Sequence, residues 1–198
     1  MKSLKNKILT ALFIAFTIFC NSYKISAQDP IPFKMGDKYG LKNSAGAVIV
    51  EPKYKYINEF SEGLAHVEVG NFNVGVKHGF IDIYGKEVVE PKYNEVRDFS
   101  EGLAVVGLGN YQIEKVKYGY INKFGKVVVQ LIYDDAGNFS EGLANVGLED
   151  LRIGFKSGYI DKTGKTVIAL KYDKAFSFSV GPKHWRDLAR LLLQLPYG

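Results

Sequence analysis

The chain has 198 residues and one cysteine, and with 46% hydrophobic and 24% charged residues its composition is typical of a globular protein. Its formal net charge is +5, but four lysines and Cys20 lie within residues 1–27, which hold no acidic residue. Without that stretch the charge falls to +1 and no thiol remains, which excludes disulfides, thiolate metal sites and cysteine nucleophiles. The near-neutral charge also removes the electrostatic basis for nucleic-acid binding.

Residues 1–27 have the pattern of an export signal. A basic start is followed by the largely apolar residues 8–20, and the small residue Ala27 stands at the expected cleavage point. The apolar run is shorter than the roughly 20 residues that cross a bilayer as a helix. Phe19 before Cys20 does not fit a lipoprotein signal. We expect an exported protein, periplasmic, outer-membrane-associated or secreted, with no transmembrane segment in the mature chain.

Residues 28–37 stand between this signal and the rest of the chain. They contain Pro30 and Pro32, and proline fixes φ and removes a backbone donor. We expect a stiff leader without regular structure.

An internal repeat organises the following residues, 38–181. The hexapeptide Phe-Ser-Glu-Gly-Leu-Ala occurs three times, 39 and 40 residues apart, beginning at Phe60, Phe99 and Phe139. Its glycines are Gly63, Gly102 and Gly142. Further glycines recur in two blocks, first Gly40, Gly79, Gly119 and Gly158, then Gly46, Gly85, Gly125 and Gly164. The units run at about 38–77, 78–117, 118–156 and 157–181.

Each unit is predicted to be β structure. An Asn or Asp three residues before the second glycine is typical of hairpin turns, and β-branched strands flank it. A third strand follows the hexapeptide and alternates in character. Ala65 and Val67 share one of its faces, while the opposite face, with His66 and Glu68, is mixed and expected to be half exposed.

A unit of this size cannot bury its apolar face alone, so neighbouring units must stack. We therefore expect an all-β fold, an open array of roughly four hairpin or three-stranded repeats forming a solenoid or superhelix. A closed four-bladed propeller is the alternative, because about 40 residues suit one blade. Three strands per unit and the loss of the hexapeptide in the fourth unit favour the open array.

Residues 182–198 break the repeat and predict a short helix. Pro182 suits a first helical turn, and Trp185, Leu188 and Leu192 share one face. Three interpretations stay open: a cap over the end of the array, a docking helix for a partner or membrane surface, and a tail produced by a frame shift.

The recurring blocks resemble those of the WG-repeat (KWG-type) proteins, whose units contain Lys-Trp-Gly-Tyr-Ile-Asp, a glycine turn, Pro-Lys-Tyr and Phe-Ser-Glu-Gly-Leu-Ala. The resemblance covers about Lys38 to Gly181. In place of the family's tryptophan this chain has Tyr39, His78, Tyr118 and Ser157. The resemblance implies an exported or envelope-associated bacterial protein without known catalytic residues, and it assigns no substrate.

The repeated acids are Glu62, Glu101 and Glu141. A glycan hydrolase needs one pair of carboxyl groups in unlike environments, whereas the repeat supplies the same glutamate three times. We interpret these glutamates as turn or backbone caps, and expect no catalytic residue and no enzyme activity.

The histidines, His66, His78 and His184, are not at ligand spacing in the sequence. A zinc site needs several converging ligands, so three scattered imidazoles in a chain without mature thiols do not predict one. We expect neither a metal nor a cofactor.

Aromatic rings that recur once per unit are the remaining candidates for binding. The phenylalanines of the hexapeptide are interpreted as core, and the candidate ligand-binding residues are Tyr54, Tyr93, Tyr133 and Tyr172. The leading hypothesis is a non-enzymatic protein that binds another macromolecule at the bacterial envelope or outside the cell. A carbohydrate-binding module using these tyrosines is the alternative, and a glycan hydrolase is the second. The sequence indicates neither the ligand nor the oligomeric state.

Overall fold

The computed structural model describes residues 30–71, 75–110 and 114–176, and these form β-strands and turns without a helix. The predicted export signal, residues 1–27, and the predicted helical tail, residues 182–198, lie outside the described residues. In the part of the chain that is described, nothing has the helical length and apolar character needed to cross a bilayer.

The strands of the first half are β1 (Ile31–Met35), β2 (Lys38–Lys42), β3 (Val48–Tyr54), β4 (Tyr56–Ile57), β5 (Leu64–Asn71), β6 (Gly75–Asp82) and β7 (Glu87–Tyr93). Those of the second half are β8 (Glu95–Val96), β9 (Leu103–Asn110), β10 (Glu114–Asn122), β11 (Val127–Tyr133), β12 (Asp135–Ala136), β13 (Leu143–Asp150), β14 (Gly154–Asp161) and β15 (Thr166–Tyr172).

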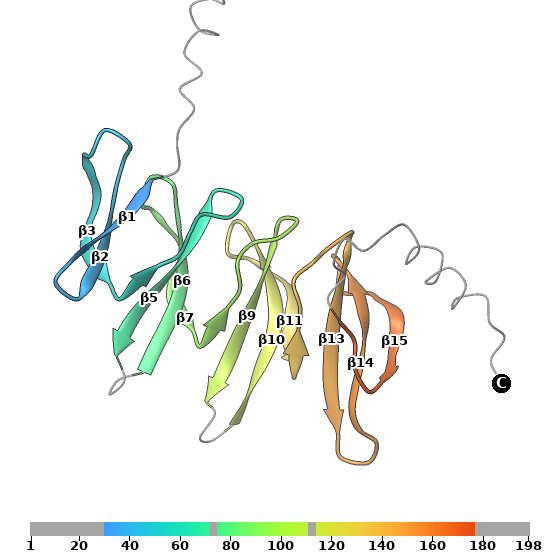
Figure 1. Ribbon diagram of the computed structural model, residues 1–198. Coiled ribbons are helices and arrows are strands. Elements are labelled where there is room, and N and C mark those ends of the chain that lie inside the picture. Colours follow the sequence, from blue (N-terminus) through green and yellow to red (C-terminus); the bar gives the residue numbers. More distant parts are fainter. Residues whose placement is uncertain (1–29, 72–74, 111–113, 177–198) are drawn as a thin grey trace, which may run out of the picture.

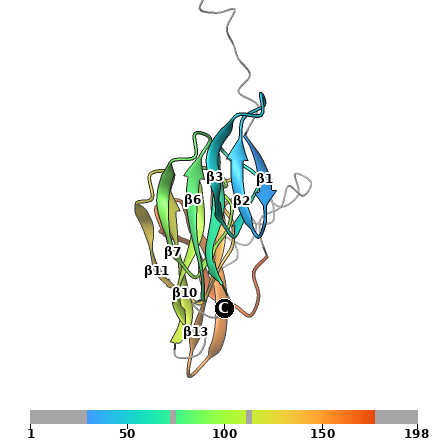
Figure 2. The same ribbon diagram turned by 90° about the vertical axis from the view of Figure 1, so that its left-hand side faces the viewer.

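These strands build four antiparallel sheets, and within each sheet the strands lie side by side in their order along the chain. The first sheet is β1-β2-β3, and the others are β4-β5-β6-β7, β8-β9-β10-β11 and β12-β13-β14-β15. The sheets follow one another in a row with the first and the fourth at opposite ends (Figure 1), and seen along the row they lie one behind another (Figure 2). The predicted all-β open array of hairpins is confirmed.

The sheets are out of phase with the sequence units. The long hairpin β5–β6, which closes at the pair Asn71 and Gly75, joins the end of the first unit to the start of the second. Each complete unit therefore supplies the last two strands of one sheet and the first two of the next, so the covalent chain ties successive sheets together. The expectation of three strands per unit missed the two-residue strands β4, β8 and β12.

The leader is shorter than expected, because Ile31–Met35 forms β1 and pairs with β2. Pro32 lies opposite Leu41 in this pair. The strand is at the edge of the first sheet, where a residue without a backbone N–H is tolerated because one side of the strand has no neighbour.

The hairpin turns follow the Asx chemistry predicted from the sequence. Asp82 Oδ1 accepts hydrogen bonds from the backbone N–H groups of Tyr84 and Lys86, both at 2.9 Å. The same two bonds recur at Asn122 and Asp161. The glycine that ends each turn has a φ of 75–85°, a conformation that residues with a side chain rarely adopt.

The Ser-Glu-Gly corner is a two-residue hairpin turn. Ser61 and Leu64 exchange backbone hydrogen bonds of 2.8 and 3.1 Å. Between them, Glu62 and Gly63 have φ values of 53° and 84°, and positive φ at both positions is typical of a type I′ turn. A glutamate in this conformation is uncommon, and it recurs in the two later hexapeptides.

The glutamates of the first two corners reach across to the next sheet. Glu62 Oε2 accepts a hydrogen bond from the Gly102 N–H and pairs with Lys123 Nζ, both at 3.0 Å. Glu101 repeats this arrangement with Gly142 and Lys162, at 3.0 and 2.9 Å. The interpretation as backbone caps is confirmed for Glu62 and Glu101, with the difference that each of them caps the following unit.

The corner glutamates predict an acid-sensitive contribution to stability. Burial alone would raise the pKa of Glu62, but the bonds from Lys123 and Gly102 outweigh it and hold that pKa below its usual value. A lowered carboxyl pKa stabilises the folded chain above the unfolded pKa of about 4.3, and this contribution disappears as the pH falls through the folded pKa. We expect Glu62→Gln to lower the free energy of unfolding by about 1 kcal/mol near pH 7 and by almost nothing near pH 3.

Urea unfolding at the two pH values checks this prediction. Glu90→Gln, at an exposed position of β7, is the control and is expected to be neutral at both. An effect of Glu62→Gln that is equal at both pH values would contradict the proposed charge pairing.

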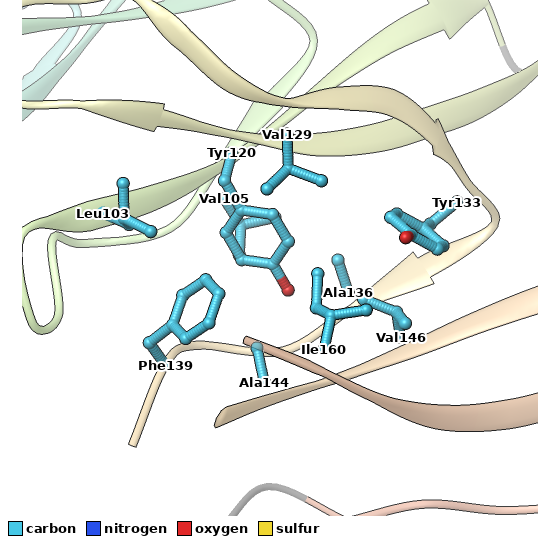
Figure 3. Packing of buried hydrophobic residues seen from close by; sticks show 10 residues of the cluster. All are labelled: Leu103, Val105, Tyr120, Val129, Tyr133, Ala136, Phe139, Ala144, Val146 and Ile160. Atoms are coloured by element: carbon cyan, nitrogen blue, oxygen red, sulfur yellow. The ribbon is translucent and has the colours of Figure 1, made fainter. Parts of the chain in front are cut away.

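The core consists of three clusters, one between each pair of successive sheets. Alternate residues of β9 serve two of them: Ala104 and Val106 pack against the second sheet, while Leu103 and Val105 pack against the fourth. Figure 3 shows the latter cluster, in which side chains from both sheets meet around Tyr120. The expectation of a half-exposed second face is wrong for β9, because a further sheet covers it.

Aromatic pairs lie within these clusters. Phe80 meets Phe99 edge to face with ring centroids 4.9 Å apart, and Tyr120 meets Phe139 at 4.8 Å. Phe99 and Phe139 are buried, as the sequence predicted, and Phe60 is half buried against the first cluster. The hexapeptide phenylalanine thus fills the space between two sheets, as Figure 3 shows for Phe139.

Candidate functional site

An open pocket of about 460 Å³ lies where the first sheet meets the second. It is bordered by β1, β2, β4, β5 and the turn between β1 and β2. Its lining residues carry two positive charges, two negative charges and two phenol rings: Lys34, Asp37, Tyr39, Lys55, Tyr56 and Glu68. A pocket of this composition provides both ring surface and hydrogen-bonding groups to a ligand.

A row of rings runs from this pocket across the second sheet. Tyr39 meets Tyr56 edge to face, with centroids 5.6 Å apart. Tyr56 lies 6.3 Å from the ring of His66, which lies 5.9 Å from that of His78. Of these rings, Tyr56 is exposed, at 42%. Its ring contacts with Tyr39 and His66 favour one orientation of the Tyr56 ring.

The hairpin β5–β6 brings His66 and His78 together. His66 and Glu68 are two residues apart and share a face of β5, and Glu68 lies directly opposite His78 on β6. One ligand atom from each of the three side chains lies within 4.8 Å of the other two. The sequence spacing did not indicate this proximity, because strand pairing brings together two histidines that are twelve positions apart in the chain. His184 lies outside the described residues.

The two imidazoles have different surroundings. His66 Nδ1 lies 3.3 Å from Asp98 Oδ1, and Asp98 is itself held by the Asn58 side-chain amide at 3.0 Å. His78 Nδ1 is buried and has no hydrogen-bond partner among the described residues. Burial lowers the pKa of His78, and the nearby Glu68 carboxylate opposes this shift without cancelling it. The net lowering favours a neutral ring near pH 7.

The predicted tyrosine ladder lies mostly inside the molecule. Tyr54, Tyr93 and Tyr133 belong to the three core clusters and are 1%, 2% and 6% exposed. The Tyr54 hydroxyl donates a 2.7 Å hydrogen bond to Glu87, and burial, followed by this bond, raises the pKa of Tyr54. Of the four candidates, Tyr172 is the one with an exposed surface, at 37%.

Two strongly exposed rings were missed by the sequence analysis. Tyr84 and Phe124 occupy the third position of the hairpin turns β6–β7 and β10–β11, and are 77% and 87% exposed. The corresponding residues of the first and fourth units are Ala45 and Thr163. An aromatic residue inside an Asx-Gly turn was the available signal, because side chains at the tips of hairpins have few neighbours to cover them.

Comparison with known families agrees with the repeat seen in the structure. The family model for the WG-containing repeat matches residues 39–71, 79–111, 118–151 and 158–181, more than half of the chain. The chain belongs to the WG-containing repeat family. WG repeats are a non-catalytic repeat family. A search of curated proteins finds no significant match.

Two residues of the candidate site stand where the usual WG repeat has its tryptophan. Tyr39 and His78 both stand in the place of that tryptophan, and both belong to the row of rings beside the pocket. At the equivalent place in the third unit, the Tyr118 hydroxyl donates a 2.6 Å hydrogen bond to Glu95. The side chain at this place thus changes from unit to unit, while the glycine that follows is kept.

Proposed function

We propose that this WG-repeat protein is an exported, non-enzymatic binding protein that holds a protein partner at the bacterial envelope or outside the cell. The observation that carries the proposal is the pocket between the first and second sheets, with the exposed and oriented ring of Tyr56 at its edge. Membership of a repeat family supports a binding role.

The lining of the pocket suits a protein surface. Tyrosine is enriched among the residues that contribute most to protein–protein affinity, because it buries a large area with few rotatable bonds. Around Tyr56 stand Lys34 and Lys55 together with Asp37 and Glu68. Charges of both signs favour a partner with a matching pattern and disfavour a uniformly charged polymer.

Export rests on the sequence. A basic start, a short apolar run and a small residue at the expected cut are typical of a secretory signal. The mature chain lacks cysteine, so its fold does not depend on the redox state of its compartment.

Carbohydrate binding is the second candidate, favoured by the same exposed ring. A tyrosine ring with hydroxyl, carboxylate and ammonium groups nearby offers both stacking and hydrogen bonds to a sugar. The surface available for this lies at Tyr56, in contrast to the buried rings of the predicted ladder.

A retention experiment separates the two candidates. The purified protein is incubated with solubilised envelope proteins and, separately, with insoluble cell-wall and plant polysaccharides, and the retained material is identified. We expect a reproducible protein partner whose affinity falls about tenfold or more in Tyr56→Ala, because an interfacial tyrosine typically contributes more than 1.4 kcal/mol.

Tyr84→Ala is the matched control, since it removes an even more exposed tyrosine that stands in the β6–β7 turn and does not line the pocket. It is expected to bind as the unchanged protein does. If the protein is retained on a polysaccharide and Tyr56→Ala abolishes that retention, the ligand of the pocket is a glycan and not a protein. Equal binding by both variants and the unchanged protein would refute the pocket as the binding site.

A further inference from the structure

We propose that His66, Glu68 and His78 form a binding site for a divalent transition-metal ion, with Zn²⁺ the best chemical match. Two imidazoles and one carboxylate are the ligand set of three-ligand zinc sites, which leave a fourth position for water or another donor. The proposal does not depend on what occupies the neighbouring pocket.

The distances are compatible with coordination. The three candidate ligand atoms lie within 4.8 Å of one another. In a tetrahedral zinc site, ligand atoms about 2.0–2.2 Å from the ion lie roughly 3.3–3.6 Å apart. Side-chain rotations that bring these atoms about 1 Å closer together would therefore place them on one ion.

The backbone holds the three residues in a fixed relation. They lie in the middle of the hairpin β5–β6, where Glu68 is paired with His78 and His66 is two residues away on the same face. Their side chains are largely buried, with exposed fractions of 17% for each histidine and 23% for Glu68. Partly buried side chains lose little further freedom when they bind an ion, which favours binding.

Asp98 provides the outer contact that metal-binding histidines usually have. Its carboxylate lies 3.3 Å from His66 Nδ1 and is fixed by Asn58. When Nδ1 carries the proton and its N–H donates a hydrogen bond to Asp98, the lone pair of Nε2 is left for a metal. Such carboxylate–histidine pairs fix both the tautomer and the orientation of a ligand.

His78 supplies an independent sign that a group is missing. Its Nδ1 is buried and has no hydrogen-bond partner among the described residues. Glu68 Oε1 is the nearby acid, and at 4.0 Å it is beyond hydrogen-bond reach. An unsatisfied buried nitrogen is costly, and an ion between this nitrogen and the carboxylate would remove that cost.

The other sheets do not offer the same ligands. The pair equivalent to Glu68 and His78 is Gly107 and Tyr118 in the third sheet, and Gly147 and Ser157 in the fourth. At Gly107 a Cβ atom would lie 2.7 Å from Val116 Cγ1 and 2.9 Å from the Tyr118 ring, so these two side chains leave little room for a longer residue there. The second sheet has a carboxylate and an imidazole at this pair.

Titration of the untagged, metal-free protein with Zn²⁺ by calorimetry, and with Co²⁺ by visible absorption, tests the proposal. We expect one ion per chain, a cobalt spectrum typical of nitrogen and oxygen ligands, and a higher melting temperature with zinc. His66→Asn, Glu68→Gln and His78→Asn should each abolish saturable binding. Asp98→Asn should weaken it about 10–100-fold, as loss of an outer contact does.

His66→Asn places in β5 the residue that Asn145 provides at the same place in β13, so a folded variant is expected. Circular dichroism confirms folding for each variant, and Glu90→Gln serves as the control with unchanged zinc affinity. Absence of saturable binding by the unchanged protein overturns the proposal. So does binding that survives in all three ligand variants, because the ion would then lie elsewhere.

Discussion

Replacing Phe139 by alanine is expected to lower the free energy of unfolding by about 3–5 kcal/mol. The ring is 1% exposed and lies in the cluster between the third and fourth sheets, edge to face with Tyr120 at 4.8 Å. Alanine removes this contact and leaves a cavity that two separate sheets cannot easily close. Urea unfolding followed by circular dichroism measures the effect.

The loss of stability should also be greatest in the sheets next to the substituted residue. In a repeat array each unit contacts only its neighbours, so a weakened boundary uncouples what lies beyond it. We expect hydrogen exchange in Phe139→Ala to accelerate more in β12–β15 than in β1–β3. Phe124→Ala is the matched control, since this ring is 87% exposed and its loss should cost less than about 0.5 kcal/mol. Comparable costs for the two variants would contradict stacking as the source of stability.

Replacing Gly119 by alanine is expected to cost about 3 kcal/mol, the upper part of the range for overpacking. An added Cβ would lie 2.5 Å from the Val129 carbonyl oxygen and 2.8 Å from that of Gln130. Both atoms belong to the backbone of the paired strand β11, which would have to shift. The same approach, at 2.3–2.5 Å, recurs at the equivalent glycine of all four units. It explains why this glycine is kept where the tryptophan before it is not.

Gly102→Ala is the control that separates the cost of an unfavourable backbone conformation from the cost of placing a Cβ atom where there is no space. Gly102 has a φ of 86°, and an added Cβ there would meet no atom within 4 Å. Alanine at this position should therefore cost only the strain of its backbone conformation, about 1–2 kcal/mol. If Gly102→Ala proves less stable than Gly119→Ala in thermal or urea unfolding, the close approach of β11 to Gly119 is not the main cost of a side chain there.

The fold was predictable from the sequence to the level of the repeat. The hexapeptide and the Asx-Gly turns fix hairpins by local chemistry, so an open all-β array follows from them. The phase of the sheets was not predictable, because a periodic sequence has no marked starting point and the long hairpins cross the unit boundaries. The strand at Ile31–Met35 was missed for another reason: Pro32 argues against a strand except at the edge of a sheet.

The candidate site was less predictable, because it depends on which residues become neighbours across strands. Tyr54 and Tyr133 recur at the same place in their units, and a recurring ring fits a shared core as well as a ligand site; the structure buries both. The trio around Glu68 required the register of β5 with β6, which the sequence does not state. Residues that differ between units, such as His66 and His78, are the ones that give the second sheet its own chemistry.

Site-specific photo-cross-linking tests whether this WG-repeat protein binds the proposed protein partner at the pocket between its first two sheets. A photoreactive benzoylphenylalanine replaces Tyr56 in one variant and Tyr84 in another, and both are illuminated in cells that produce the protein. Both positions are exposed, so they report location rather than accessibility. We expect a specific adduct from position 56 and none from position 84. An adduct from position 84 alone would place the binding surface at the hairpin tips and contradict binding at the pocket.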